Sequence, residues 1–402
     1  MRNVVIAAAC RTPIGTIGGQ FKSLTALDLS IPVMQGLIQR SGIKGEMIDD
    51  VIWGCNYQRT YKENNLARVA AVKAGLPVTV PGITIHRNCT SSMSSIQLAY
   101  YQIKAEEAEC IMAGGADSMS TAPHMVFHAR FGQKYGNMEL RDSMWDSLTN
   151  LGIGPAMGVT AENVAEKYHI SRKQMDEFAY RSQIRAVDAM AHGRFLEEII
   201  PVRLESKHGV CEMAEDEYPK KDITMEGLEK LRPAFIEQGK VTAGNSSGMN
   251  DASSGVLVIE ESLAEKMNLP ILARIISTAT TGVDPQIMGI GPVSASRSAL
   301  HKAGLTIEDI DLVEINEAFA SQCLACQQEL DIPDHKLNVN GGAISLGHPV
   351  GATGARIVTS LIYELRRSGK KYGLATLCAG GGMGTALILE NRDHSVFMNP
   401  IF

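Results

Sequence analysis

The sequence predicts an α/β fold in which helices alternate in layers with mainly parallel sheets. Two observations carry this prediction. Short apolar strands alternate with helix-like stretches along most of the chain, which is typical of layered α/β proteins. The chain also repeats part of itself, because residues 41–51 and 303–313 align without gaps and share glycine, glutamate, isoleucine, aspartate and valine.

The two copies stand in the same local context, which predicts a duplicated unit. Each follows a helix-like stretch and leads into a strand, "VIWG" or "VEIN". Further on, "IMAGGADSM" (111–119) and "LCAGGGMGT" (377–385) each run from an apolar strand into Ala-Gly-Gly. We therefore expect an N-terminal half formed by residues 1–120 with 246–270, an inserted loop domain at 121–245, and a C-terminal half at 271–402.

Composition excludes several classes of protein. The chain has 402 residues, 45% of them apolar and 20% charged, which is typical of an ordinary soluble globular protein with ample material for a core. A net charge of -6 without any basic block gives no attraction to nucleic acid. The start, "MRNVVIAAACRTPIG", reads as a first strand, and no apolar run is long enough for a bilayer. We expect no membrane partner and a cytoplasmic location.

The eight cysteines show no framework spacing, and in a chain this long they are expected to be free thiols. Cys323 and Cys326 form a C-x-x-C, but no second pair or histidine cluster accompanies them. Together with Phe319 they follow helical spacing, so a buried helix face is favoured over zinc or redox use.

The stretch "GITIHRNCTSSMSSIQLAYYQI" (82–103) predicts a nucleophile position. An apolar strand turns at Arg87-Asn88, after which Met93 and Ile96 begin a helical repeat. Cys89 then lies at the start of a helix, where the dipole and free amides would stabilise a thiolate and lower its pKa. The alternative is a small buried cysteine.

A lone histidine stands in "NGGAISLGHPVGATGAR" (340–356), surrounded by small residues. Glycines let a ligand approach the backbone closely, so an imidazole here is accessible. A histidine with a pKa near neutrality can take a proton from a thiol and help hold an oxyanion. His348 is a candidate base, with a satisfied loop histidine as the alternative.

Two further stretches carry candidate chemistry. In "CAGGGMGTALIL" (378–389) Cys378 ends a strand before three glycines, which suits proton transfer beside exposed backbone amides. The spacing is not that of a nucleotide-phosphate loop. In "VEINEAFA" (313–320) Asn316 follows a strand, where it either caps the next helix or positions a water or carbonyl.

Taken together, these motifs resemble the thiolase family over nearly the whole sequence. "NVNGGAISLGHPVGATGAR", "NEAFA" and "CAGGGMGTA" look like the histidine, asparagine and second-cysteine motifs of that family. "KLRPAF", "VTAGNSSGMNDASSGVL" and "MGIGPV" also match. The resemblance implies a duplicated αβαβα layered fold with two mixed, mainly parallel sheets.

The resemblance also implies a role for each candidate. Cys89 would be acylated by a thioester after His348 activates it, and Asn316 would hold a water that completes one oxyanion hole with His348. Cys378 would be the acid and base of the carbon–carbon step. The backbone amides of Cys89 and Gly380 would form a second oxyanion hole. A thiolate suits this chemistry because it is a good nucleophile and a good leaving group.

The family likeness suggests further contacts to the substrate, with coenzyme A and acetyl-CoA as substrates and no metal or organic cofactor. The inserted domain would bind CoA and make oligomer contacts. The residues expected near CoA or the acyl group are Ser247, Lys220, Lys221, Met157, Met288, Phe319 and Phe235. The alternative interpretation of the two lysines is a run of charges that is simply solvated. For the methionines and phenylalanines, the alternative is an ordinary role in the core.

Two departures from the family pattern affect the substrate more than the reaction. The nucleophile segment often reads Cys-Gly-Ser-Gly, whereas here Thr90 and Ser92 replace the glycines. Ala156 precedes Met157 where acetoacetyl-type thiolases commonly have histidine, so a longer or branched acyl group would have room. Chain length and the biosynthetic or fatty-acid-degrading direction stay open.

Two other functions compete with a thiolase that cleaves 3-ketoacyl-CoA or condenses two acetyl-CoA. A ketoacyl synthase-type condensing enzyme shares the fold but generally lacks a second cysteine in a setting like that of Cys378. A non-catalytic thiolase-like acyl-CoA or lipid-binding protein would be expected to lose Cys89, His348 or Cys378, and all three are present. The resemblance further implies a homo-oligomer, a dimer or a dimer-of-dimers tetramer, with residues 130–142 in the region of a tetramer-forming loop.

Overall fold

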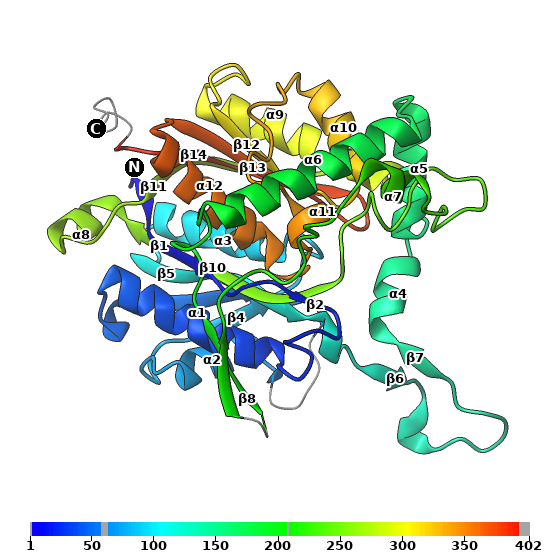
Figure 1. The fold of residues 1–402 in the computed structure, drawn as a ribbon. Coiled ribbons are helices and arrows are strands. Elements are labelled where there is room, and N and C mark those ends of the chain that lie inside the picture. Colours follow the sequence, from blue (N-terminus) through cyan, green and yellow to red (C-terminus); the bar gives the residue numbers. More distant parts are fainter. Residues whose placement is uncertain (1, 58–62, 207–208, 394–402) are drawn as a thin grey trace.

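The computed structural model describes residues 2–57, 63–206 and 209–393 (Figure 1). Its strands are β1 (Val4–Arg11), β2 (Gly15–Thr16), β3 (Asp50–Gly54), β4 (Gly82–Ile85), β5 (Cys110–Ser118), β6 (His124–Val126), β7 (Leu140–Asp142), β8 (Val202–Ser206), β9 (Gly209–Met213), β10 (Asn250–Glu260), β11 (Ala273–Gly282), β12 (Leu312–Ile315), β13 (Tyr372–Ala379) and β14 (Met383–Glu390). Its α-helices are α1 (Ala26–Ser41), α2 (Leu66–Lys73), α3 (Ser91–Lys104), α4 (Ser143–Thr149), α5 (Met157–Lys167), α6 (Arg172–Ala191), α7 (Met225–Glu229), α8 (Glu261–Lys266), α9 (Gly291–Ala303), α10 (Ala320–Glu329), α11 (Ala343–Leu346) and α12 (Thr353–Ser368).

The layers follow the αβαβα order implied by the sequence. Helices α1 and α2 pack on the outer face of the strands of the first half, and α9 and α10 cover those of the second half (Figure 1). Helices α3 and α12 pack against each other between the two sets of strands. Strand β1 is buried on both faces, since Val5 and Ala7 belong to the outer cluster whereas Val4 and Ile6 belong to the central one.

The α/β class is confirmed, but the expected strand arrangement needs correction. Within the described residues the large sheet runs β12-β13-β14-β11-β1-β10-β5-β3-β4, and its two halves are joined where Val5 and Ile6 pair with Arg274 and Ala273. The parallel pairs along this order are β3–β4, β3–β5 and β12–β13, and the other pairs are antiparallel. The sheets are therefore not mainly parallel. One reason is that β13 returns as β14 through three glycines, a turn that can join only antiparallel strands.

The predicted repeat occupies equivalent places in the two halves. Each copy runs from the end of a helix, α1 or α9, into a strand, β3 or β12, that pairs in parallel with the next strand of its half. The two Ala-Gly-Gly stretches differ. Gly114 and Gly115 lie inside β5, where a Cβ on Gly114 would meet Trp53, whereas Gly380 to Gly382 form the β13–β14 turn. The same Ala-Gly-Gly sequence therefore allows close packing in one half and a tight turn in the other.

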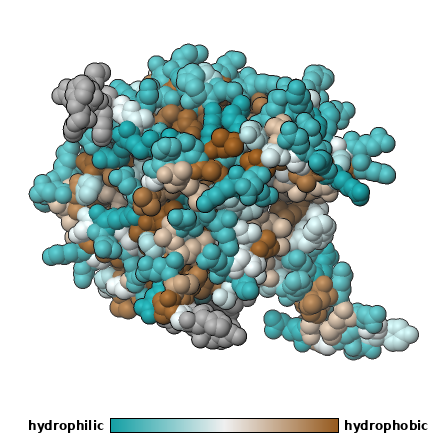
Figure 2. All heavy atoms as spheres, viewed as in Figure 1, coloured by the Kyte–Doolittle hydropathy of each residue, from teal (hydrophilic) through white to brown (hydrophobic). Residues whose placement is uncertain are grey.

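One segment projects from the layered body. Strands β6 and β7 and helix α4 extend away from the sheet at the lower right of Figure 1, and Figure 2 shows apolar side chains along this extension. The exposed apolar residues of the projecting segment are Met125, Val126, Phe127, Phe131, Tyr135, Met138, Leu140 and Trp145. No helix in the described part of the chain is long and apolar enough to cross a membrane.

Candidate active site

Cys89 lies at the strand-to-helix turn that the sequence predicts. Strand β4 ends at Ile85, and α3 begins at Ser91, directly after Thr90. The residue before the cysteine, Asn88, has a φ of 47°, a left-handed conformation that asparagine adopts more readily than other residues with a Cβ. This turn places the Cys89 side chain at a half-buried position on the surface of a pocket.

Asn88 also ties the nucleophile turn to the other half of the molecule. Its Nδ2 donates to the carbonyl oxygen of Gly380 at 2.7 Å, and its Oδ1 lies 3.0 Å from Nε2 of His86. The sequence analysis assigned no function to Asn88. Its position immediately before a cysteine at a tight turn was the available signal.

Cys378 lies on the hairpin that Asn88 reaches. It is the second-last residue of β13, it pairs with Gly384 of β14, and its side chain is fully buried. Gly381 and Gly382 have φ values of 86° and 84°, which residues with a Cβ rarely adopt. The glycines thus allow the tight turn that follows Cys378 and presents the backbone of Gly380 to Cys89.

His348 is held so that one ring nitrogen has no protein partner. Its Nδ1 lies 2.7 Å from Oγ1 of Thr353, whose hydroxyl proton is donated to the carbonyl oxygen of Pro349. Nδ1 therefore carries the proton and donates to Thr353, which leaves the lone pair on Nε2. Nε2 is buried and makes no hydrogen bond within the described residues. This tautomer is the one a general base requires.

Asn250 fixes the backbone around His348. The amide of His348 donates to Oδ1 of Asn250 at 3.0 Å, and Gly347 before His348 has a φ of 105°. A Cβ on Gly347 would overlap the Asn250 side chain. Two residues further on, Val350 lines the same pocket as Cys89. The small residues of this loop therefore allow close packing around His348, and the loop reaches the pocket at Val350.

Asn316 does not cap the next helix, so that reading is wrong. It follows β12, but α10 begins at Ala320, and the residue before that helix is Phe319. Both atoms of its side-chain amide are buried and lack a hydrogen-bond partner within the described residues. The neighbouring Glu317 is held instead, by Ser182, Asn338 and a backbone amide. The geometry leaves the Asn316 amide free to position a small molecule or carbonyl.

The charge states differ from the sequence-based expectation. Burial raises the pKa of Cys89 to about 11, although the backbone amides of Gly380 and of Cys89 itself act in the opposite direction. Burial, with the charge of Arg356 as a second cause, lowers the pKa of His348 to about 3. The predictions of a lowered thiol pKa and a near-neutral histidine are therefore wrong for the free protein. The pair is a neutral thiol and a neutral imidazole.

Burial also raises the pKa of Cys378 well above its ordinary value, and the nearby Cys89 adds to the shift. The two thiols are therefore close enough to influence each other's ionisation. They come from opposite halves of the chain. Both are protonated near neutral pH, which gives the site two thiol proton donors.

A pocket of about 310 Å³ opens beside Cys89. Its apolar wall includes Met125, Leu148, Leu151, Met157 and Val350. Of the residues predicted to line the acyl site, Met157 does line this pocket, and its sulfur lies 3.2 Å from where a Cβ on Gly380 would be. The volume is within the range of small-molecule pockets.

The other predicted apolar residues lie apart from that pocket wall. Met288 and Phe319 belong to the core of the second half, and Phe235 packs edge-on against Phe319 with ring centres 6.0 Å apart. Ser247 donates its backbone amide to the carbonyl oxygen of Ala318. These contacts put Phe235 and Ser247 next to the turn that carries Asn316.

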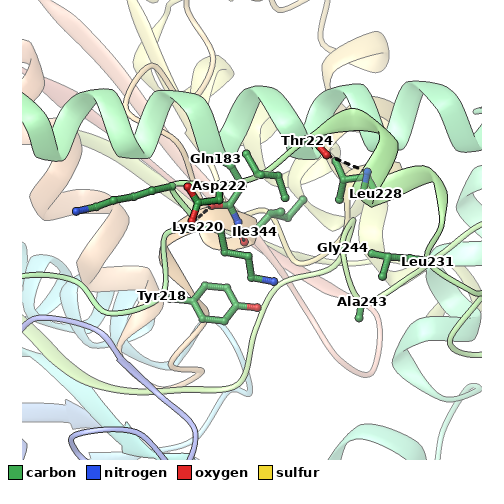
Figure 3. A pocket seen from close by; sticks show the side chains of 13 residues that line it. Gln183, Tyr218, Lys220, Asp222, Thr224, Leu228, Leu231, Ala243, Gly244 and Ile344 are labelled. Carbon is green, nitrogen blue, oxygen red and sulfur yellow. Dashed lines mark hydrogen bonds between the residues drawn. The ribbon is translucent and has the colours of Figure 1, made fainter.

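A second pocket, of about 520 Å³, contains both predicted lysines (Figure 3). Lys220 and Lys221 line it with Tyr218, Ala243 and Gly244. The ammonium group of Lys220 lies 5.9 Å from the Tyr218 ring, close enough for a cation–π contact. Both lysines therefore line a cavity large enough for a nucleotide-sized group.

Asp117, which the sequence analysis did not select, connects three segments around Cys89. It is buried at the end region of β5 and accepts hydrogen bonds from the backbone amides of Asn56, Tyr57 and Gly351. The first two belong to the loop after β3, and the third follows His348. Nothing in the sequence near Asp117 signals these partners, because they lie far from it along the chain.

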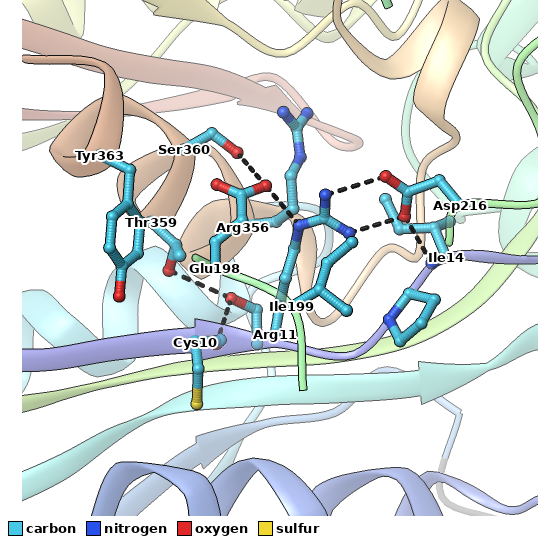
Figure 4. A network of polar contacts seen from close by, with 12 residues as sticks. Cys10, Arg11, Ile14, Glu198, Ile199, Asp216, Arg356, Thr359, Ser360 and Tyr363 are labelled. Atoms are coloured by element: carbon cyan, nitrogen blue, oxygen red, sulfur yellow. Dashed lines mark hydrogen bonds and ion pairs between the residues drawn. The ribbon is translucent and has the colours of Figure 1, made fainter. Parts of the chain in front are cut away.

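A buried network of charges holds the inserted segment to β1 (Figure 4). The guanidinium group of Arg11 donates to Glu198 at 2.7 Å and to Asp216 at 2.6 and 2.9 Å. Nearby, Arg356 is buried and lies 3.7 Å from Glu314, whose pKa burial raises to about 8. Ser360 of α12 also donates to Glu198 at 3.2 Å, and because breaking such buried pairs is costly, the network fixes α12 and the insertion relative to β1.

Cys323 and Cys326 lie on the buried face of α10, in agreement with the favoured interpretation. The Cys326 thiol contacts the carbonyl oxygen of Gly289 at 3.3 Å. Within the ranges the structure describes, no group of three or more His, Cys, Asp or Glu is arranged to hold a metal ion.

Comparisons with known proteins agree over nearly the full length. Residues 4–262 match the family profile described as "Thiolase, N-terminal domain", and residues 269–391 match "Thiolase, C-terminal domain". An acetyl-CoA acetyltransferase of Syntrophomonas wolfei is 48% identical over 394 residues, covering 97% of this chain and 99% of the relative. The Bacillus anthracis acetyl-CoA acetyltransferase superposes with a TM-score of 0.95 at 46% identity, over 97% and 99% of the two chains. Human mitochondrial 3-ketoacyl-CoA thiolase in complex with CoA superposes with a TM-score of 0.93 at 43% identity, over 97% of this chain and 98% of that chain.

Proposed function

The chain belongs to the thiolase family, and from this premise we propose that Cys89 is the nucleophile, His348 its base, and Cys378 the acid and base of the carbon–carbon step. The protein is an acyltransferase that catalyses the thiolase reaction. That reaction either cleaves a 3-ketoacyl-CoA with CoA or condenses two molecules of acetyl-CoA. The observation that carries the assignment is that Cys89 and Gly380 line one pocket, where Asn88 beside Cys89 donates to the carbonyl oxygen of Gly380 on the Cys378 hairpin at 2.7 Å.

In the cleavage direction, Nε2 of His348 takes the thiol proton as the Cys89 sulfur attacks the 3-keto carbon. Because the pKa of Cys89 is raised to about 11 and that of His348 is lowered to about 3, a stable ion pair does not precede the attack. Proton transfer accompanies formation of the carbon–sulfur bond. The negative charge then develops on the former carbonyl oxygen, where hydrogen-bond donors stabilise it.

Collapse of this adduct breaks the bond between the second and third carbons. The acyl group stays on Cys89, and the electron pair forms the enolate of acetyl-CoA, which the Cys378 thiol protonates. The proton held by His348 then returns to the Cys378 thiolate. A second CoA thiol gives its proton to His348 as it attacks the acyl-Cys89 thioester, Cys89 leaves as a thiolate and takes that proton back, and the shortened acyl-CoA is released. Condensation runs the same steps in reverse, with Cys378 as base.

Two sets of donors would stabilise the oxyanions. The backbone amides of Cys89 and Gly380 form one set. The other consists of His348, after it has gained a proton, and a water bound to the Asn316 amide. Support for the second set is that Nε2 of His348 and both amide atoms of Asn316 are buried without protein partners. This chemistry requires no metal or organic cofactor, because thiols, an imidazole and amides supply every group.

The pocket with Lys220 and Lys221 is proposed to hold the nucleotide end of CoA. Two ammonium groups beside a cavity of about 520 Å³ suit a phosphorylated nucleotide. Ser247 and Phe235, which is 43% exposed, would then lie along the path of the pantetheine arm. The three-part division at residues 120, 245 and 270 is kept as a proposal, as is a cytoplasmic location.

We also propose that the protein is a homo-oligomer, with a tetramer favoured. Strand β4 ends the large sheet, and Ile83 on it is 48% exposed, so a second copy can pair with this edge. The projecting segment carries Phe131 and Tyr135, which are more than 90% exposed and suit contacts between such dimers. The mass in solution tests this, and a single-chain mass would contradict it.

The decisive experiment is CoA-dependent cleavage of acetoacetyl-CoA, of a six-carbon, a longer and a 2-methyl-branched 3-ketoacyl-CoA, with Cys89→Ala as the blank. We expect turnover by the wild type and a loss of at least about 10⁴-fold in the variant, because the nucleophile is removed. If the wild type cleaves none of these substrates, the proposed activity is wrong.

A further inference from the structure

Helix α4 forms a thin wall of the pocket beside Cys89. Ser143, Ser147 and Leu148 line the pocket, and their spacing places them on one side of the helix. On the other side Trp145 is 65% exposed. None of the seven residues of α4 is fully buried, so packing alone holds this wall weakly.

A hydrogen bond connects α4 to Tyr57, which lies in the loop after β3. The Tyr57 hydroxyl lies 2.8 Å from Oγ of Ser147, and Ser147 donates its own proton to the carbonyl oxygen of Met144 at 2.7 Å. The Tyr57 hydroxyl is therefore the donor. At its start, α4 also makes a backbone hydrogen bond to the preceding segment, from the amide of Ser143 to the carbonyl oxygen of Pro123.

Tyr57 is itself firmly placed. It is 6% exposed, and its amide donates to Asp117 at 3.1 Å. Its ring belongs to a small apolar cluster with Met119 and Val350, against which Cys89 and Met144 pack. The same side chain thus contacts both the surroundings of Cys89 and helix α4.

The size of the pocket suggests a function for the hydrogen bond between Tyr57 and Ser147. A cavity of about 310 Å³ is much larger than an acetyl group, and Ser147 and Leu148 of α4 line it together with Cys89. The tail of a longer acyl group on Cys89 would therefore extend along α4. We propose that Tyr57, by holding Ser147, sets the longest acyl chain that the pocket accepts. The inference rests on the proposed function and assigns to Tyr57 a specificity-determining role.

The test is the chain-length dependence of kcat/KM for straight-chain 3-ketoacyl-CoA substrates, from acetoacetyl-CoA to long-chain members. Tyr57→Phe keeps the ring and removes only the hydroxyl, and Ser147→Ala removes its acceptor. Thr149→Ala is the matched control, because Thr149 bonds the Trp145 carbonyl within the same helix and does not line the pocket.

We expect Tyr57→Phe to raise kcat/KM for the longest substrates by about 3- to 10-fold relative to acetoacetyl-CoA, as loss of one hydrogen bond would allow. The change should lie in KM, while acetoacetyl-CoA changes by less than about 2-fold, since a small acyl group does not reach α4. The double variant should shift no more than either single variant, because both remove the same bond.

An unchanged profile in both Tyr57→Phe and Ser147→Ala, or an equal shift in Thr149→Ala, would overturn the inference alone. A uniform loss for all substrates would also overturn it, because it would indicate a general structural role. An inactive wild type would instead overturn the proposed function, and the inference with it.

Discussion

The two candidate thiols stand in contrasting surroundings, because Cys89 follows a strand whereas Cys378 lies inside one. Cys89 lies at an irregular turn before a helix and is half-buried at the wall of a pocket. Cys378 lies within a regular antiparallel pair and is fully buried. Burial raises the pKa of both, but only Cys89 has two backbone amides directed at its sulfur from separate segments, its own and that of Gly380.

The difference shows how one residue type can serve two purposes. A nucleophile must be reached by the substrate, and charge that develops near it must be stabilised, which suits the turn. A proton donor must stay protonated until the enolate forms, which suits the enclosed hairpin. Exposure and backbone donors, rather than the thiol itself, would separate the two proposed roles.

The sharpest test of this contrast is Cys378→Ala. We expect the variant to accept an acyl group from acetyl-CoA on Cys89 but to lose carbon–carbon cleavage and condensation by about 10²- to 10⁴-fold, the usual contribution of a general acid or base. Intact-protein mass after incubation with acetyl-CoA measures the first step, and turnover of acetoacetyl-CoA the second. Acylation of Cys378 in the wild type would reverse the two roles.

A smaller effect is expected where the two thiol segments are joined. Asn88→Gly keeps a left-handed backbone but removes the bond to Gly380, whereas Asn88→Ala removes the bond and strains the turn. We expect about a 10-fold loss in carbon–carbon cleavage for the glycine variant and a larger loss for alanine, because the Cys378 hairpin is no longer aligned with Cys89.

The control for Asn88 is exchange of the acyl group between Cys89 and CoA, which does not require Cys378. It should fall less than cleavage does in the glycine variant. Equal losses in exchange and cleavage would mean that Asn88 supports the nucleophile turn as a whole and does not align the two segments.

The last prediction concerns the ionisation of Cys89, for which we expect the smallest signal: no thiolate near neutral pH. Because the pKa of Cys89 is raised to about 11, its thiolate should be missing between about pH 6 and pH 9 and should form only as the pH approaches 11. The difference in ultraviolet thiolate absorbance between wild type and Cys89→Ser measures this. A step near pH 7 would indicate a stable thiolate–imidazolium pair and would weaken the contrast with Cys378.

Local features of the site were predictable from the sequence. The strand, turn and helix around Cys89 follow from the change in apolar spacing between Ile85 and Met93, and β4 and α3 confirm them. The turn after Cys378 follows from three successive glycines. Both predictions use interactions between residues close in the chain, which a sequence displays directly.

Features that depend on distant partners were not predictable. The ionisation of Cys89 depends on how deeply the fold buries it, and the helix start alone suggests the wrong direction of the shift. Thr353, which fixes the tautomer of His348, and Tyr57, which contacts α4, carry no signal of their own. Strand direction was missed for the same reason, since alternating helices and strands do not reveal that β1 pairs with β10 and β11 in opposite sense.

The position of β1 has a consequence for synthesis of the chain on the ribosome. This first strand pairs with β10, which begins at Asn250, and with β11, which begins at Ala273. At about 5–20 residues per second, β1 waits at least roughly ten seconds before its partners are made. During that time an apolar strand with two open edges is exposed, so the nascent chain is a natural client for chaperones that shield such segments.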